Sequence, residues 1–336
     1  MAEIQQQLGT AMSPGGAAAI GPSPGRRSRE PLNWKRIGKR IWRYKWIYVM
    51  MLPTLLVIFI FRYIPMYGLQ LAFKNYKLAG IAASPWNDFA HFKRMLGYPG
   101  FMQALQNTLI ISMMRIVIGF PFPIILALMI NEVRLRRSKR VLQTIYTFPH
   151  FLSWVLLAGI MLNMFGQAGI VRKVIEAINP AWAADWNLLY DAGAYRWMVV
   201  FSDMWKEAGW GTIIYLAAIA GIDEALFEAA AIDGAGRGQR IRHILLPGII
   251  GMIAIQFVLR IGSMMEGGFD QIFNTYNEPV YRTGDIIDTF VYRMTFQRGA
   301  DMGFTTAVGL FKNVVNFALL LMANAITRAL GQRTLW

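Results

Sequence analysis

The sequence contains no cysteine, only three histidines, and no recognisable motif for ATP hydrolysis. Without cysteine the chain can form no disulfide and offers no thiolate to a metal. The histidines, His91, His150 and His243, are far apart and lack the H-E-x-x-H spacing of a hydrolytic zinc site. No G-x-x-x-x-G-K-[ST] segment occurs, so no phosphate-binding loop for ATP is evident. We therefore expect no catalytic residues, no metal site and no cofactor bound by this chain.

Charged residues are also scarce, at 16% of the 336 residues, whereas hydrophobic residues make up 55%. A helix needs about 20 mostly apolar residues to cross the hydrocarbon core of a bilayer, which is about 30 Å thick. Six runs approach or exceed this length: Trp46–Ile64, Leu105–Ile130, Val141–Phe165, Trp197–Ala220, Gly248–Met265 and Thr306–Ile326. A soluble helical core could mimic one or two of these runs but not six. The sequence thus predicts an all-α polytopic membrane protein with about six transmembrane helices.

The segment before the first run, residues 1–45, is rich in Gly, Ala, Ser, Pro and Gln and then becomes basic, with Trp34, Trp42 and Tyr44 interleaved. The first composition favours disorder, and the second is typical of an anchor on anionic lipid. We predict a partly disordered cytoplasmic tail that binds membrane lipid, so the formal charge of +15 requires no nucleic acid. The first run is long enough to span and has no small-x-small cleavage site after it, so we expect a retained span.

The positions of the basic residues predict the orientation of the chain. If the N-terminus is cytoplasmic, nineteen of the 34 lysines and arginines lie on the cytoplasmic side, eleven on the other side and four within the runs. Short cytoplasmic segments carry the denser positive charge, as the positive-inside rule expects. We predict that both termini are cytoplasmic, with a transmembrane domain over 46–330 and a short C-terminal tail over 331–336.

A polar loop at 221–247 separates the fourth and fifth runs. Asp223 is a candidate N-cap for a helix over Glu224–Ile232, and Asp233-Gly234 should end that helix. A second short helix is expected from about Gln239 to Leu246, ending at Pro247. Two short helices meeting at a glycine could dock into a groove of another protein. The alternative is an ordinary amphipathic loop on the membrane surface.

The loop resembles the signature loop of membrane subunits in bacterial ABC importers. The matching residues are Glu228, Ala229, Ala230, Asp233, Gly234, Ala235, Ile244, Leu246 and Pro247. Further segments, at 143–154, 209–218, 268–277, 285–293 and 334–336, resemble a subgroup of carbohydrate permeases similar to the maltose-importer subunits. That subgroup is associated with oligosaccharides and polysaccharide fragments, including alginate and aldouronate. The resemblance covers nearly the whole chain after about residue 40.

This resemblance implies a type I ABC importer permease fold in the bacterial cytoplasmic (inner) membrane, with residues 221–247 forming cytoplasmic coupling helices. It also implies several partners: a second homologous permease subunit, two cytoplasmic ATPase subunits that bind ATP and Mg, and an extracytoplasmic sugar-binding protein. The main alternative is an ion-coupled secondary sugar transporter, which would need carboxylates near the midplane and usually internal repeats. Here Asp203 and Glu207 crowd around Lys206, and no repeat is evident. A membrane scaffold without transport activity is a third possibility.

Charges inside the runs are candidates for the substrate pathway, because ionisable groups in hydrocarbon are costly and usually face a partner or a water-filled path. Arg115 lies near the middle of its run and has no acid there. Lys312, Asn313 and Asn316 share one side of the sixth run. We therefore predict a pathway lined by Arg115, Lys312, Asn313 and Asn316, which would suit an acidic sugar. The alternatives are structural pairs, such as Arg260 with Glu266, and asparagine hydrogen bonds between helices.

Overall fold

The computed structural model describes residues 39, 42–184, 186–297, 299 and 301–332. The chain is divided into two compact units, Met1–Ile64 and Pro65–Trp336. Most of the predicted basic tail and most of the predicted C-terminal tail lie outside the described residues. Within the described part of the chain the regular structure is helical, apart from one isolated bridge between Lys74 and Trp86. The all-α prediction is therefore confirmed.

The first unit is built on one helical segment that begins as α2 (Lys45–Ile58) and continues as a π-helical turn, η1 (Phe59–Tyr63). The helical path extends through η2 (Ile64–Phe73), so it is longer than the predicted run. None of the residues in α2 and η1 is buried, although their composition is strongly apolar. A helix with apolar side chains on every face needs lipid or another protein around it.

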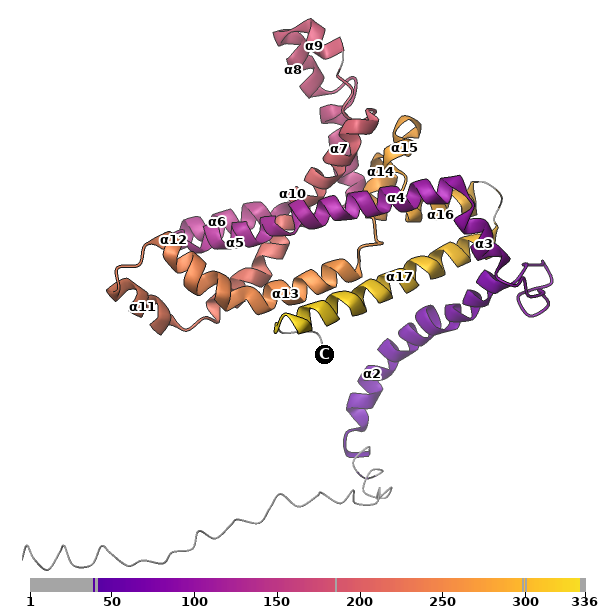
Figure 1. The fold of residues 1–336 in the computed structure, drawn as a ribbon, viewed down its shortest axis with the longest axis horizontal. Helices are drawn as coiled ribbons and strands as arrows, with labels where there is room; N and C mark the ends of the chain where they lie inside the picture. Colours follow the sequence, from indigo (N-terminus) through magenta and orange to yellow (C-terminus); the bar gives the residue numbers. More distant parts are fainter. Residues whose placement is uncertain (1–38, 40–41, 185, 298, 300, 333–336) are drawn as a thin grey trace, which may run out of the picture. The chain divides into compact units, whose positions relative to one another are not determined.

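The second unit contains four long helical segments and one broken one. The long segments are α4–η3–α5 (Pro99–Met114, Arg115–Gly119, Pro121–Asn131), α10 (Ala192–Ala220), α12–η5–α13 (Arg237–Arg240, Ile241–Leu245, Leu246–Gly262) and α17 (Met302–Ala329). In this unit α10 packs against α5 and α13, and α13 packs against α17 (Figure 1). The loop helix α11 (Glu224–Ile232) lies at one end of the unit, whereas α3 (Ala90–Leu96) and α16 (Ile287–Phe296) lie at the other end (Figure 1).

Five helical segments among the described residues are long and apolar enough to cross a membrane. The 29-residue helix α10 is not one of them, because every 18-residue stretch of it contains Asp203, Lys206 and Glu207. Its length still suits a span, and its charges are satisfied by neighbouring helices, as described below. The chain is therefore a multi-pass membrane protein.

The predicted third span, Val141–Phe165, is wrong as a continuous helix. The structure has α6 (Arg136–Thr147), a 3-10 turn η4 (Phe148–Phe151) and then α7 (Trp154–Phe165). Pro149 has no amide hydrogen to donate to the preceding turn. Leu152 and Ser153 are extended, and the Ser153 hydroxyl accepts a hydrogen bond from the amide of Leu156 and so begins α7. The helix direction changes at this point (Figure 1).

The remaining helices are short. They are α8 (Ile170–Ile178), α9 (Pro180–Ala184), α14 (Phe269–Thr275), η6 (Glu278–Val280) and α15 (Tyr281–Gly284). Acidic N-caps set several helix starts, because a carboxylate accepts the free amides of the first turn. Asp191 caps α10 through the amide of Ala194 at 3.0 Å, and Asp301 caps α17 through the amide of Phe304 at 3.0 Å.

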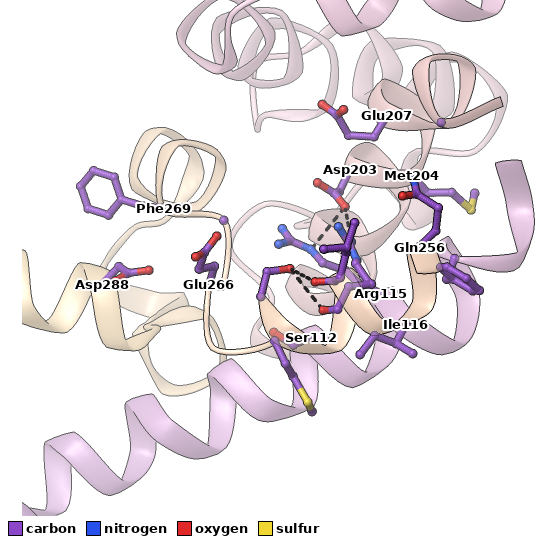
Figure 2. A pocket seen from close by; sticks show the side chains of 18 of the residues that line it. Ser112, Arg115, Ile116, Asp203, Met204, Glu207, Gln256, Glu266, Phe269 and Asp288 are labelled. Atoms are coloured by element: carbon purple, nitrogen blue, oxygen red, sulfur yellow. Dashed lines mark hydrogen bonds and ion pairs between the residues drawn. The ribbon is translucent and has the colours of Figure 1, made fainter. Parts of the chain in front are cut away.

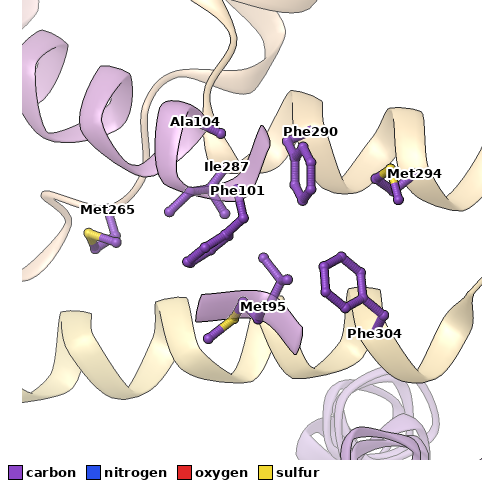
Figure 3. Close-up of a cluster of buried hydrophobic side chains, with 9 residues drawn as sticks. Met95, Phe101, Ala104, Met265, Ile287, Phe290, Met294 and Phe304 are labelled. Carbon is purple, nitrogen blue, oxygen red and sulfur yellow. The ribbon is translucent and has the colours of Figure 1, made fainter. Parts of the chain in front are cut away.

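Two buried apolar clusters hold the ends of the second unit. One joins α3, α4, α16 and α17 and includes Met95, Phe101, Phe290 and Phe304, all at most 1% exposed (Figure 3). The other lies near α11 and joins α5, α10 and α13 through Ala127, Tyr215, Ile219, Leu245 and Ile249. Between these two apolar regions the helices carry the charged residues that line a cavity.

Candidate functional site

A cavity of about 1050 Å³ lies among η3, α5, α10, α13, α14, α16 and α17 (Figure 2). Its charged lining residues are the cations Arg115, Arg260 and Lys312 and the acids Asp203, Glu207, Glu266 and Asp288. The sequence predicted Arg115 and Lys312 at such a site, and both lie there. Asn313 and Asn316, predicted with them, are not among the lining residues.

Arg115 begins the π-helical turn η3 and is 5% exposed. Its guanidinium donates to the carbonyl of Gly267 at 2.9 Å and to the side chain of Gln271, and it lies 3.5 Å from the carboxylate of Asp203. The acid that its own span lacks is therefore supplied by α10. A Cβ on Gly268, where φ is +83°, would lie 2.6 Å from the guanidinium, so this glycine is needed for the close approach. Arg115 thus fixes the linker between α13 and α14.

Asp203 is shared between two arginines. The guanidinium of Arg260 also lies 3.5 Å from its carboxylate, and the Arg260 side chain is 40% exposed, against 7% for that of Arg115. Arg260 therefore pairs with Asp203 and not with Glu266, the partner considered from the sequence. One carboxylate facing two guanidiniums leaves an excess positive charge, and the accessible part of it is on Arg260.

Lys312 pairs with Asp288 of α16, with Nζ and Oδ1 2.5 Å apart. Asn316 is buried, and its side-chain oxygen accepts a hydrogen bond from the amide of Met265 at 2.8 Å. This contact joins α17 to the linker that follows α13, so Asn316 has a structural role, close to the helix–helix hydrogen bond that the sequence left open. Asn313 is exposed.

Glu207 has two polar partners on the side of the cavity next to η4. Its carboxylate lies 2.9 Å from Nδ1 of His150 and accepts from Lys206 Nζ at 3.0 Å. Lys206 also donates to the carbonyl of His150 at 2.8 Å, and the His150 ring stacks on Trp210 with centroids 4.6 Å apart. The sequence placed both Asp203 and Glu207 near Lys206, and the acid that Lys206 contacts is Glu207. This cluster ties the break between α6 and α7 to α10, which gives His150 a structural role.

Sequence reasoning missed several aromatic lining residues, among them Phe269, Tyr292 and Phe296, and it also missed Asp288. These residues lie between the fifth and sixth apolar runs, outside the segments that the sequence predicts to span the membrane. The spacing of four between Tyr292 and Phe296 was the available signal, since residues at i and i+4 share a helix face.

The exposed loop at 221–247 begins as predicted. Asp223 accepts from the amide of Ala225 at 3.0 Å, α11 covers Glu224–Ile232, and Gly234 has φ +72°. The predicted coupling residues Glu228, Ala229, Asp233 and Gly234 are exposed, whereas Ala230, Ala235 and Ile244 are half-buried. The loop therefore presents a short helix and a tight turn outward.

The predicted helix end at Pro247 is wrong, because the helix continues from α12 through η5 into α13. Pro247 occupies the first turn of α13, where no amide donor is needed. The π-helical turn η5 lies directly before α13, and its wider hydrogen-bond spacing accommodates the absence of an amide hydrogen at Pro247. Movement of the loop can thus reach the cavity through one continuous helix, on which Arg260 lies.

The loop also contacts α5, the span that precedes α6. Arg237 of α12 lies 3.8 Å from Glu132 at the end of α5, beside a hollow of about 320 Å³ that Phe227 of α11 also lines. Phe227 packs against the apolar cluster of α5, α10 and α13. The loop is therefore exposed on one side and anchored to three spans on the other.

Apolar spans surround a charged cavity, and an exposed helical loop lies at one end, an arrangement that suits a membrane transport subunit. Residues 119–332 match the family model described as binding-protein-dependent transport system inner membrane component. The chain belongs to this family. It is a transport subunit and not an enzyme, and the ion-coupled alternative is set aside.

Two relatives from Bacillus subtilis (strain 168) are similar over most of their length. The chain is 41% identical to Protein LplB, covering 88% of this chain and 92% of the relative. It is 36% identical to the polygalacturonan/rhamnogalacturonan transport system permease protein YteP, and the match covers 90% of this chain and 94% of the relative.

Two solved structures have the same fold. One is a bacterial ABC transporter involved in the import of the acidic polysaccharide alginate, with a TM-score of 0.79 and 39% identity over 88% of this chain and 99% of that chain. The other is a bacterial alginate ABC transporter in complex with an alginate pentasaccharide-bound periplasmic protein. Its TM-score is 0.80, and it is 38% identical over 89% of this chain and 100% of that chain.

Proposed function

We propose that this chain forms one half of the membrane pathway of an ATP-driven importer for acidic oligosaccharides, the fragments of polyuronate polysaccharides. Relatives named for polygalacturonan and alginate support the substrate class. The observation that carries the proposal is the sharing of Asp203 by Arg115 and Arg260, which places an accessible guanidinium in the cavity. A guanidinium offers paired donors that match a carboxylate.

The cavity also suits transit better than tight binding. Its three cations face four acids, and two of the acids, Glu207 and Asp288, are held by Lys206 and Lys312. A pathway must accept its substrate and also release it. In this arrangement Arg115 positions Asp203 and the linker, while Arg260 and Lys312 supply the charge that the sugar meets.

The partners follow from the same proposal. A second, homologous permease completes the cavity, an extracytoplasmic binding protein delivers the sugar, and two ATPase subunits bind ATP and Mg²⁺. Both termini and α11 face the cytoplasm, where α11 and the turn at Gly234 dock into the ATPase. Closure of the ATPase dimer moves the loop, and the two membrane halves then expose the cavity to each side in turn.

Uptake into proteoliposomes containing the whole transporter tests the substrate class. The probes are alginate and oligogalacturonate oligosaccharides, with maltooligosaccharides as neutral probes. Loss of a charge-assisted hydrogen bond costs about 1.5–3 kcal/mol, so Arg260→Gln and Lys312→Gln should reduce uptake of the acidic probes by about 10- to 100-fold. Arg282→Gln is a matched control, because Arg282 is exposed and does not line the cavity.

Basal ATPase activity and assembly should stay unchanged in all three variants. Import of maltooligosaccharides alone by the wild-type transporter would exclude an acidic substrate. Equal effects of the two cavity variants on acidic and neutral sugars would exclude charge recognition by this chain.

A further inference from the structure

Six aromatic side chains form a connected series between the cavity and α15, which we call the aromatic ladder. Its members are Phe269, Phe273, Tyr276, Tyr281, Tyr292 and Phe296. From the cavity outward, the ring centroids are 5.1 Å apart for Phe296 and Tyr292, 4.7 Å for Tyr292 and Phe273, 6.3 Å for Phe273 and Tyr276, and 4.9 Å for Tyr276 and Tyr281. Phe269 joins the series by stacking on Phe273 at 5.0 Å.

The local sequence explains why these rings line up. Phe269 and Phe273 are four residues apart on α14, and Tyr292 and Phe296 are four apart on α16, so each pair shares one helix face. The two helices pack against each other, which brings the two pairs together. The bend after Thr275 then places Tyr276 against Tyr281 of α15.

The ladder differs from the aromatic residues of the core. Phe101, Phe290 and Phe304 are at most 1% exposed and pack among other apolar side chains. No member of the ladder is buried, and Phe296 is 73% exposed. Phe269, Tyr292 and Phe296 line the cavity, and Figure 2 places Phe269 on the same side of it as Glu266 and Asp288.

We propose that the aromatic ladder is a stacking surface for the sugar rings of the transported oligosaccharide. The idea rests on the proposed function and adds the residues that hold the uncharged part of the substrate. A pyranose ring has an apolar face of C–H groups, which packs on the flat face of an aromatic ring, and its hydroxyls can bond to a phenol at the edge. A series of adjacent rings can contact successive sugar units of one chain.

The electrostatics of the ladder suit a carboxylated sugar. The phenol of Tyr276 is neutral at physiological pH and does not repel an anion, and partial desolvation, which raises its pKa to about 12, disfavours its ionisation further. A cation lies near each end. Arg293 lies over the Tyr281 ring at 4.9 Å and also donates to the carboxylate of Asp285 at 3.0 Å. Lys312 contacts Asp288, one helical turn before Tyr292. Sugar rings would stack on the aromatic groups while their carboxylates remain near these cations.

The position of the ladder fits import. The helices that carry it, α14, α15 and α16, lie on the side of the unit away from α11 (Figure 1), and Phe269, Tyr292 and Phe296 line the cavity. If α11 faces the ATPase, the ladder lies on the side of the binding protein, where the sugar would enter the cavity. Each stacking contact is weak and resembles the next one, so a chain can shift from one ring to another without a deep energy minimum.

Substitution tests the ladder in the whole transporter in proteoliposomes, with an alginate pentasaccharide and a disaccharide as probes. Phe269→Leu and Tyr292→Leu keep the apolar volume but remove the flat face, and uptake of the pentasaccharide should fall about tenfold or more. Tyr292→Phe keeps the ring and should retain most of the uptake. Phe201→Leu is the matched control, because Phe201 belongs to a similar stacked pair with Trp197 that does not line the cavity.

The disaccharide should be less affected than the pentasaccharide, since it contacts fewer rings. If the leucine variants transport both probes at the wild-type rate, or if Tyr292→Phe is as defective as Tyr292→Leu, the ladder does not stack sugars. If the wild-type transporter imports neither probe, the proposed substrate class fails instead.

Cysteine labelling gives a second measurement that does not depend on transport, because the chain has no native cysteine. In the assembled transporter trapped with vanadate, the pentasaccharide and its binding protein should slow maleimide labelling of Phe296→Cys severalfold. Labelling of Phe201→Cys should not change. Equal labelling of Phe296→Cys with and without the sugar would contradict contact between sugar and ladder.

Discussion

Asp203 is the residue that organises the charged part of the cavity. It is the carboxylate nearest to both Arg115 and Arg260, and it comes from a different helix from either. A buried charge without a partner costs several kcal/mol, so the buried Arg115 depends on this acid. The same geometry explains why two arginines that appear unpaired in their own spans are tolerated within a membrane.

Gly234 is the loop residue whose backbone conformation most clearly restricts which side chains the position can accept. Its φ of +72° costs a residue with a side chain about 1–2 kcal/mol, and more if the side chain is β-branched. We expect Gly234→Val to uncouple ATP hydrolysis from transport or to weaken assembly with the ATPase, whereas Gly234→Asn should be nearly normal. The measurements are the ratio of sugar imported to ATP hydrolysed and co-purification of the ATPase.

Gly238→Val serves as the control for this prediction, because Gly238 lies in α12 without a positive φ and has open space around it. Wild-type coupling in Gly234→Val would contradict the role assigned to the turn.

At the scale of elements, the break between α6 and α7 is held by a close approach of α10. A Cβ on Gly209 would lie 1.9 Å from the carbonyl oxygen of Tyr146, so only glycine allows this packing. The neighbouring contacts, Lys206 to the carbonyl of His150 and Glu207 to its ring, depend on the same distance. The polar residues of α10 therefore fix the angle at which α7 leaves the bundle.

We expect Gly209→Ala to force α6 away from α10 and to destabilise the protein by about 1–3 kcal/mol, the usual cost of overpacking. The melting temperature of the purified transporter should fall, and transport should decrease with it. Gly309→Ala is the control, since Gly309 is also inside a long helix but a Cβ there meets nothing within 4 Å. Equal melting temperatures for the two variants would show that α6 and α10 are not packed in this way.

At the scale of the whole molecule, the orientation in the membrane can be measured because the chain lacks cysteine. Arg137 in α6 and Glu278 in η6 are both exposed and lie on segments that we expect on opposite sides. In intact cells an impermeant maleimide should label Glu278→Cys and not Arg137→Cys. After permeabilisation both should react. Labelling of Arg137→Cys in intact cells would reverse the proposed topology.

The sequence by itself determined the class of the protein, because that class depends on local properties. Long apolar runs specify membrane helices whatever their neighbours are. The loop helix Glu224–Ile232 and the turn at Gly234 follow from capping and glycine chemistry within a few residues. The presence of Arg115 and Lys312 at the cavity was also predictable, because charges in a span have few other places to lie.

Only the tertiary structure decided how those charges are used, because the partners come from other helices. Asp203 satisfies Arg115 from α10, Asp288 satisfies Lys312 from α16, and Asn316 bonds to the amide of Met265 away from the cavity lining. The continuation of the helix past Pro247 depended on the π-helical turn before it, which has no clear sequence signal. The aromatic ladder likewise exists only because α14 packs against α16, a contact between segments that spacing along the chain does not reveal.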